Sequence, residues 1–340
     1  MINFGHYFKK HLRDNIRTLI YIHTVVLVLT FILGMKLQPV YRYGDQPRLV
    51  AYTATLYIPV IFLGILAYVL PVTEFSFFKK RINLDCAYSL PISRRAMGIV
   101  HYLVGLIVLT SAFTTSYLLN FILMLTRGPG WFDFSPMILH YLFCVLLGIC
   151  IYSFLVFVFN EANTKNDGIW FMILYTFVFL FVLMALDEII EIDWNMNQPY
   201  DFIPFAPLAR VTDNYTYLVE LRQKNYTYYS SSEPNGLPGA LIFWAILGIA
   251  SAAGIFLTFG ERRMERTEEI SDSWFGFRTL IPVYAICGNL VFYSMIDDSI
   301  FFWVVIELMA LLGYTIYRRG FHYKISDIVI LSLLLIFLVV

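Results

Sequence analysis

The sequence predicts an all-α polytopic membrane protein, and its composition and its long apolar runs carry that prediction. Only 14% of the 340 residues are charged, 59% are hydrophobic, and the mean hydropathy is +0.70. Soluble domains carry roughly 25% charged residues, and a soluble fold of this length could not bury so much apolar surface. The composition excludes a cytosolic globular enzyme, a disordered chain and a disulfide scaffold.

Nine runs are long and apolar enough to be spanning helices. They cover residues 18–35, 50–72, 97–125, 136–159, 168–186, 238–259, 279–296, 300–317 and 325–340. The third is longer than a bilayer requires, so we expect it to protrude, and the last two are short. The predicted organisation is a six-span core over 18–259, a linker at 260–278 and about three further hydrophobic helices over 279–340.

The first 17 residues predict an amphipathic helix that lies in the membrane interface. Apolar residues recur every fourth position, and basic residues occupy another face. The apolar set is Phe4, Phe8, Leu12 and Ile16, and the basic set is Lys9, Arg13 and Arg17. The alternative is that residues 1–17 are simply the basic flank of the first span.

The distribution of Lys and Arg predicts the orientation. With the N-terminus in the cytosol and nine alternating spans, 17 of the 24 basic residues fall on the cytosolic side. By the positive-inside rule, segments 73–96 and 260–278 are then cytosolic and segment 187–237 is external. A structureless external loop of that length is unusual, so we expect it to form short helices packed at the interface.

No motif of an enzyme or a cofactor site occurs in the sequence. It contains no phosphate-binding loop, GxGxxG, HExxH, CxxC or GxSxG pattern. The histidines are scattered, and we interpret each as a packing or interfacial residue: His6, His11, His23, His101, His140 and His322. The cysteines lack metal or disulfide spacing: Cys86, Cys144, Cys150 and Cys287. The chain is therefore predicted to have no catalytic, cofactor or metal site of its own, and its zero net charge suggests no nucleic-acid partner.

Two features inside the spans allow more than one interpretation. Glu307 is the one acidic residue well inside a predicted span. It is either a proton or cation site or, as we favour, a protonated or hydrogen-bonded packing residue. The pairs Gly248/Ala252 and Ala250/Gly254 have small-xxx-small spacing. They indicate close helix packing within the subunit, with a dimer seam as the alternative.

The segment between the second and third spans, residues 73–96, has two basic clusters around a short mixed stretch. The clusters are Lys79, Lys80 and Arg81, then Arg94 and Arg95. The segment is either an ordinary basic loop or a short helix presented to a soluble partner, ended by Pro91 and followed by a Ser93 cap. In the second case Tyr88 and Leu90 are the apolar anchors and Asp85 a polar contact, while the first cluster faces lipid phosphates or the interface rim.

The stretch from Phe78 to Arg95, F-x6-D-x3-S-L-P-I-S-R-R, resembles the membrane subunits of ABC-2-type exporters. The resemblance covers roughly residues 1–260. Within that family the chain looks most like bacterial permeases of peptide exporters, including the phenol-soluble-modulin type. It departs from the family's six spans by continuing after residue 277.

This resemblance implies a homodimer that binds two ATP-binding-cassette subunits, which carry the ATP and Mg²⁺. Residues 79–93 would be the coupling helix. We expect an exporter of hydrophobic or amphipathic substrates, most plausibly peptides, in the bacterial cytoplasmic membrane. The alternative is a non-transporting immunity or sensor protein that binds peptides through its external segment.

Overall fold

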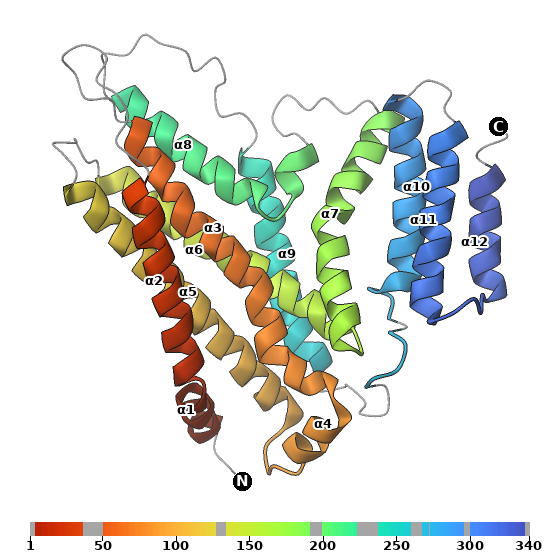
Figure 1. The fold of residues 1–340 in the computed structure, drawn as a ribbon, viewed down its shortest axis with the longest axis horizontal. Helices are drawn as coiled ribbons and strands as arrows, with labels where there is room; N and C mark the ends of the chain where they lie inside the picture. Colours follow the sequence, from red (N-terminus) through yellow and green to blue (C-terminus); the bar gives the residue numbers. More distant parts are fainter. Residues whose placement is uncertain are drawn as a thin grey trace.

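The computed structural model describes residues 4–36, 50–126, 134–190, 199–222, 237–259, 267–271, 273–295 and 300–336, and every regular element in these ranges is a helix. The helices of the first half are α1 (Phe4–Asp14), α2 (Ile16–Lys36), α3 (Val50–Phe75), η1 (Ser76–Lys79), α4 (Arg81–Tyr88), α5 (Arg94–Thr126) and α6 (Phe134–Glu161). Those of the second half are α7 (Lys165–Ile190), η2 (Pro199–Phe202), α8 (Ala206–Arg222), α9 (Leu237–Thr258), α10 (Phe277–Met295), α11 (Ile300–Arg318) and α12 (Ile325–Ile336). Figure 1 shows them as one elongated bundle with α1 and α4 at one end.

Six helices of the described chain are long and apolar enough to cross a membrane: α2, α3, α5, α6, α7 and α9. They correspond to the first six runs predicted from the sequence. With 33 residues, α5 is about 50 Å long, so it extends beyond a hydrocarbon core of about 30 Å. The chain is therefore a multi-pass membrane protein by the length and composition of its helices.

The outward faces of these helices are apolar, as a lipid environment requires. On α2 the side chains of Ile20 and Tyr21 are 57% and 69% exposed, and on α9 Ile249 is 70% exposed. In water such surfaces would drive association. Against lipid tails they cost nothing, because the tails are as apolar as the side chains.

Helix α6 lies at the centre of the bundle and packs against α3, α5, α7, α8 and α9. Its contact with α9 is close because α9 presents small residues. A Cβ at Gly248 would lie 2.5 Å from Cys150 Cβ, and one at Gly254 would lie 2.7 Å from the Phe157 ring. These contacts agree with the interpretation of the small residues as packing within the subunit.

Helices α10, α11 and α12 occupy most of the predicted segments 279–296, 300–317 and 325–340. Residues 296 and 337–340 of these segments lie outside the described chain. They follow one another outward from α7 (Figure 1). The rings of Phe171 and Phe277 join α7 to α10 with centroids 4.8 Å apart. These three helices are not among the six that meet the spanning criteria, and α10 qualifies only as a shorter apolar helix over Phe277–Val291.

The segment 187–237, which the sequence predicts to be external, contains two described helices, η2 and α8, at the end of the bundle opposite α1 and α4 (Figure 1). Helix α8 packs across α3 and α6: Tyr57 donates a hydrogen bond to Asp213, and Thr212 pairs with His140. Burial alone lowers the pKa of Arg210, but its ion pair with Asp201 at 2.9 Å outweighs this and raises the pKa. Residues 191–198 and 223–236 of this segment lie outside the described residues.

Candidate functional site

The segment between α3 and α5 forms a short exposed helix, α4. Residues before and after this helix are fixed by hydrogen bonds. Met97 and Ala96 donate backbone hydrogen bonds to the Ser93 carbonyl and to Ser93 Oγ, the latter at 3.2 Å, so Ser93 caps α5. Helix α4 ends at Tyr88, three residues before Pro91. A short helix that ends before Pro91, followed by a Ser93 cap on α5, is the local structure that the second interpretation of this segment expected.

Lys79 departs from the expectation that the first basic cluster faces lipid or the rim. It is only 3% exposed, and its Nζ donates to the carbonyl oxygens of Phe159 at 2.8 Å and Asn160 at 3.3 Å. It also donates to Ala162. The last carbonyls of a helix lack intrahelical partners and attract a cation. Lys79 therefore caps α6 and belongs to the interior of the protein.

The other predicted residues of this segment are exposed. They are Lys80, Arg81, Asp85, Leu90, Pro91, Arg94 and Arg95. Leu90 is 37% exposed, and the most exposed apolar residue of α4 is Ile82 at 78%. The Tyr88 side chain lies outside the described part. Among the described side chains of residues 80–96, the exposed large apolar residues are therefore Ile82 and Leu90, and the sequence-based interpretation assigned no role to Ile82.

Residues 267–271, in the predicted linker 260–278, connect α4 to the rest of this end of the molecule. Arg81 Nε donates to the Thr267 carbonyl at 2.8 Å. Arg319, just after α11, donates to the Glu268 carbonyl at 3.4 Å. Ser271 accepts from the Asn163 backbone N–H at 2.8 Å and donates to Asp167 at 2.6 Å. Parts of the segments 73–96 and 260–278, both predicted to be cytosolic, thus meet at one end of the bundle.

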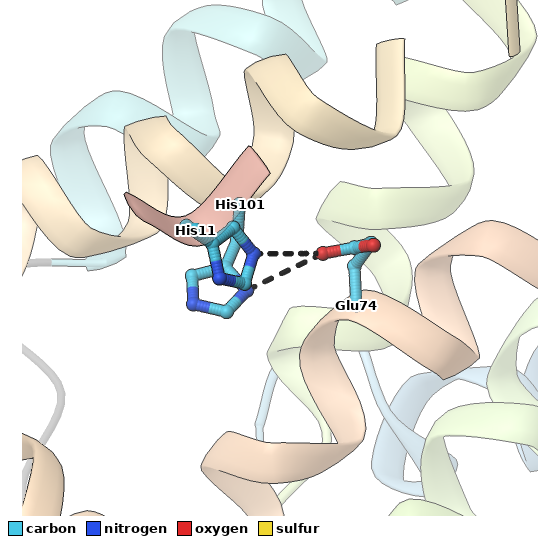
Figure 2. A group of neighbouring side chains, drawn as sticks. All are labelled: His11, Glu74 and His101. Carbon is cyan, nitrogen blue, oxygen red and sulfur yellow. Dashed lines mark hydrogen bonds and ion pairs between the residues drawn. The ribbon is translucent and has the colours of Figure 1, made fainter. Parts of the chain in front are cut away.

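Three titratable side chains from separate helices gather at the same end (Figure 2). His11 comes from α1, Glu74 from the last turn of α3 and His101 from the second turn of α5. Glu74 Oε2 lies 3.2 Å from His11 Nε2 and 3.5 Å from His101 Nδ1. The exposed fractions of these side chains are 17% for His11, 7% for His101 and 8% for Glu74.

Neighbouring aromatic rings enclose this His11–Glu74–His101 cluster. The two imidazole rings have centroids 3.9 Å apart, Phe78 lies edge-on to His101 at 4.8 Å, and Tyr7 stacks beside His11 at 6.2 Å. Burial raises the pKa of the Tyr7 phenol, so this group stays protonated. The three ligand atoms all lie within 4.8 Å of one another, an arrangement that can hold a metal ion or share a proton.

No pattern in the sequence links His11 to His101, and the sequence-based interpretation treated them as separate packing or interfacial residues. The members of the cluster are 63 and 27 residues apart along the chain, so no local spacing marks them. One signal was available: Glu74 lies at the boundary of a predicted span, where an acidic residue requires a partner.

His140 shows what a packing histidine looks like in this protein. It is 2% exposed in α6, with Nδ1 3.0 Å from the Tyr117 hydroxyl and Nε2 3.1 Å from Thr212 Oγ1. Hydroxyl groups can donate to one ring nitrogen and accept from the other. A neutral imidazole is therefore fully satisfied there, as the sequence-based interpretation assumed.

Two other predicted features occupy unremarkable positions. Glu307 is partly buried in α11, and its Oε1 has no hydrogen-bond partner within the described residues. Cys144, Cys150 and Cys287 are free thiols, and the Cys86 side chain lies outside the described part.

No family model, curated protein or solved structure matches this chain.

Proposed function

We propose that this chain is the membrane subunit of an ATP-driven exporter in the bacterial cytoplasmic membrane, with its N-terminus in the cytosol. It works as a homodimer with two separate cassette subunits, which bind the ATP and Mg²⁺. The observation that carries the proposal is helix α4. This short helix lies between the second and third spanning helices, exposes Ile82 and Leu90, and shares its end of the bundle with α1 and the basic loops.

A coupling element must be exposed to the ATPase and also be firmly joined to the spanning helices. Helix α4 meets both conditions. Just before it, Lys79 is anchored to the end of α6. At its first residue, Arg81 is hydrogen-bonded to Thr267, and the 267–271 segment continues to Asp167 of α7 through Ser271. A displacement of α4 would therefore move α6 and α7 with it.

The substrate class follows from the character of the spans. The six spanning helices are predominantly apolar and rich in aromatic residues, so a polar or charged cargo would find few partners among them. Hydrophobic or amphipathic molecules, and peptides above all, suit such a surface.

The test is co-expression with a cassette ATPase encoded beside this chain. Interface energy concentrates in a few buried apolar residues, each worth roughly 1–4 kcal/mol on truncation. The double variant Ile82→Ala/Leu90→Ala, which truncates the two exposed apolar residues, should lose co-purification of the ATPase and substrate-stimulated ATP hydrolysis in lipid nanodiscs. Lys80→Ala is the matched control, because Lys80 is exposed beside the same helix. Wild-type co-purification and ATPase activity in the double variant would remove α4 from the coupling role.

The external segment supports a second candidate, a non-transporting immunity or sensor protein. Helix α8 forms a structured surface at the end of the bundle opposite α4, tied down by its contacts with Tyr57 and His140. A chain that binds peptide through this surface but purifies without any cassette ATPase would favour that function.

A further inference from the structure

We propose that His11, Glu74 and His101 form a binding site for a divalent transition-metal ion, with zinc the best match. The bound ion would fasten α1 to the ends of α3 and α5 (Figure 2). This proposal goes beyond the exporter function and does not depend on it.

The spacing of the ligand atoms fits a tetrahedral ion. Zinc lies about 2.0–2.1 Å from imidazole nitrogen and carboxylate oxygen, which separates two ligands at the tetrahedral angle by about 3.3–3.4 Å. Glu74 Oε2 lies 3.2 Å from His11 Nε2 and 3.5 Å from His101 Nδ1. The third pair, between the two histidines, lies within 4.8 Å, so only a modest rotation of a ring is needed to complete the geometry.

Hydrogen bonds among the three side chains leave the ring nitrogens of His11 and His101 poorly paired. Besides facing Glu74, His11 Nε2 lies 3.0 Å from Asn15 Nδ2, which can only donate. A ring nitrogen that accepts from Asn15 carries no proton and cannot also donate to Glu74. His101 Nδ1 is buried, and no described residue gives it a geometrically complete hydrogen bond.

Without a proton between them, an imidazole lone pair and a carboxylate oxygen repel each other at these distances. A cation between the three atoms removes the repulsion. It also compensates the charge of Glu74, which is buried beside the two histidines, and a buried carboxylate is costly unless a cation is near.

The kind of ligand atom indicates the ion. Two imidazoles and one carboxylate are the ligand set of several zinc sites that keep a fourth position for water. Magnesium and calcium prefer sites made entirely of oxygen, whereas imidazole suits zinc, copper, iron and nickel. His140, in contrast, has a hydroxyl partner at each ring nitrogen and offers no free ligand atom.

The experiment uses the full-length protein in lipid nanodiscs, purified with a tag that contains no histidine and stripped with a chelator. Zinc is titrated in competition with a fluorescent chelator, and bound metal is counted by mass spectrometry. Wild-type protein should bind one zinc ion per chain and gain thermal stability on binding, because a ligand specific to the folded state stabilises it by mass action.

Glu74→Gln and His101→Gln should each weaken zinc binding by more than about tenfold, since changes in the outer shell of a zinc site alone cost 10–100-fold. His23→Gln is the matched control, because His23 lies on α2 with its Nδ1 2.8 Å from the Leu19 carbonyl. That variant should bind zinc like the wild type.

A spectroscopic measurement on the wild-type protein guards against variants that fail to fold. Cobalt(II) added to the stripped protein should give the intense visible absorption of a four-coordinate ion, which zinc then abolishes. Absence of that absorption, a stoichiometry far below one, or undiminished zinc binding by Glu74→Gln would each overturn the proposal. A thermal midpoint that responds to pH but not to zinc would assign the cluster to proton binding instead.

Discussion

Lys79 Nζ donates a hydrogen bond to the carbonyl oxygen of Phe159, 2.8 Å away at the end of α6. The same ammonium lies 4.9 Å from the centre of the Phe159 ring. This contact joins the turn before α4 to the helix at the centre of the bundle, which packs against five others. The first of two adjacent lysines thus has a structural role that its exposed neighbour Lys80 does not share.

Lys79→Met should destabilise the protein by about 2 kcal/mol, because a hydrogen bond to a charged group contributes about 1.5–3 kcal/mol and methionine leaves the α6 carbonyls uncapped. The measurement is the thermal midpoint in detergent, followed by size-exclusion chromatography. Lys80→Met is the control and should leave the midpoint unchanged. Equal midpoints for the two variants would contradict the capping role of Lys79.

Gly248→Ala should loosen the contact between α6 and α9. The added methyl group would lie 2.6 Å from Cys150 Cα, a backbone atom that can move only if the whole helix shifts. Overpacking of this kind costs about 1–3 kcal/mol. The matched control is Gly288→Ala in α10, where the nearest atom, Ile306 Cδ1, is 3.8 Å away. That variant should be neutral or slightly stabilising, since alanine favours helix; a loss of stability equal to that of Gly248→Ala would refute the close-packing argument.

Asp327→Asn should release α12 from α11. Asp327 receives two hydrogen bonds from the Arg318 guanidinium, at 2.9 and 3.0 Å. Both side chains are at most 10% exposed. Breaking one partner of a buried pair costs about 3–5 kcal/mol, because the other charge is left uncompensated. Hydrogen exchange in the backbone of α12 should accelerate while that of α6 stays unchanged; unaltered exchange in α12 would show that the pair does not hold it.

The orientation can be checked by cysteine labelling in a cysteine-free background. Lys80, just before α4, and Glu188, in the last turn of α7, are both exposed. Helix α4 and the end of α7 that leads toward η2 lie at opposite ends of the bundle (Figure 1). In intact cells a membrane-impermeant reagent should label Glu188→Cys, and it should reach Lys80→Cys only after the cells are opened. The reverse pattern would invert the topology and remove α4 from the reach of a cytosolic ATPase.

Glu307→Gln should keep transport within about threefold of wild type if this residue serves packing. The amide is nearly isosteric with a protonated carboxyl group, the form that a membrane interior favours. Transport of labelled peptide into inside-out vesicles measures the effect. Complete loss of transport in a monodisperse protein would identify Glu307 as a proton or cation site.

The sequence by itself determined the class of the protein and its six long spans. These properties depend on local composition, because the length of an apolar run decides whether a helix can cross a bilayer. The end of α4 before Pro91 and the Ser93 cap were also predictable, because a helix end and a cap depend on residues close together in the chain. The three further apolar runs that the sequence predicted as spans do not meet the spanning criteria among the described residues.

Only the tertiary structure decided how the side chains at the α1 and α4 end of the bundle are oriented. Lys79 and Lys80 are identical and adjacent, yet one is buried because the carbonyls at the end of α6 happen to lie beside it. His11, Glu74 and His101 come together only because α1, α3 and α5 meet at one point. The packing of distant helices produces such a meeting, and no spacing along a single chain encodes it.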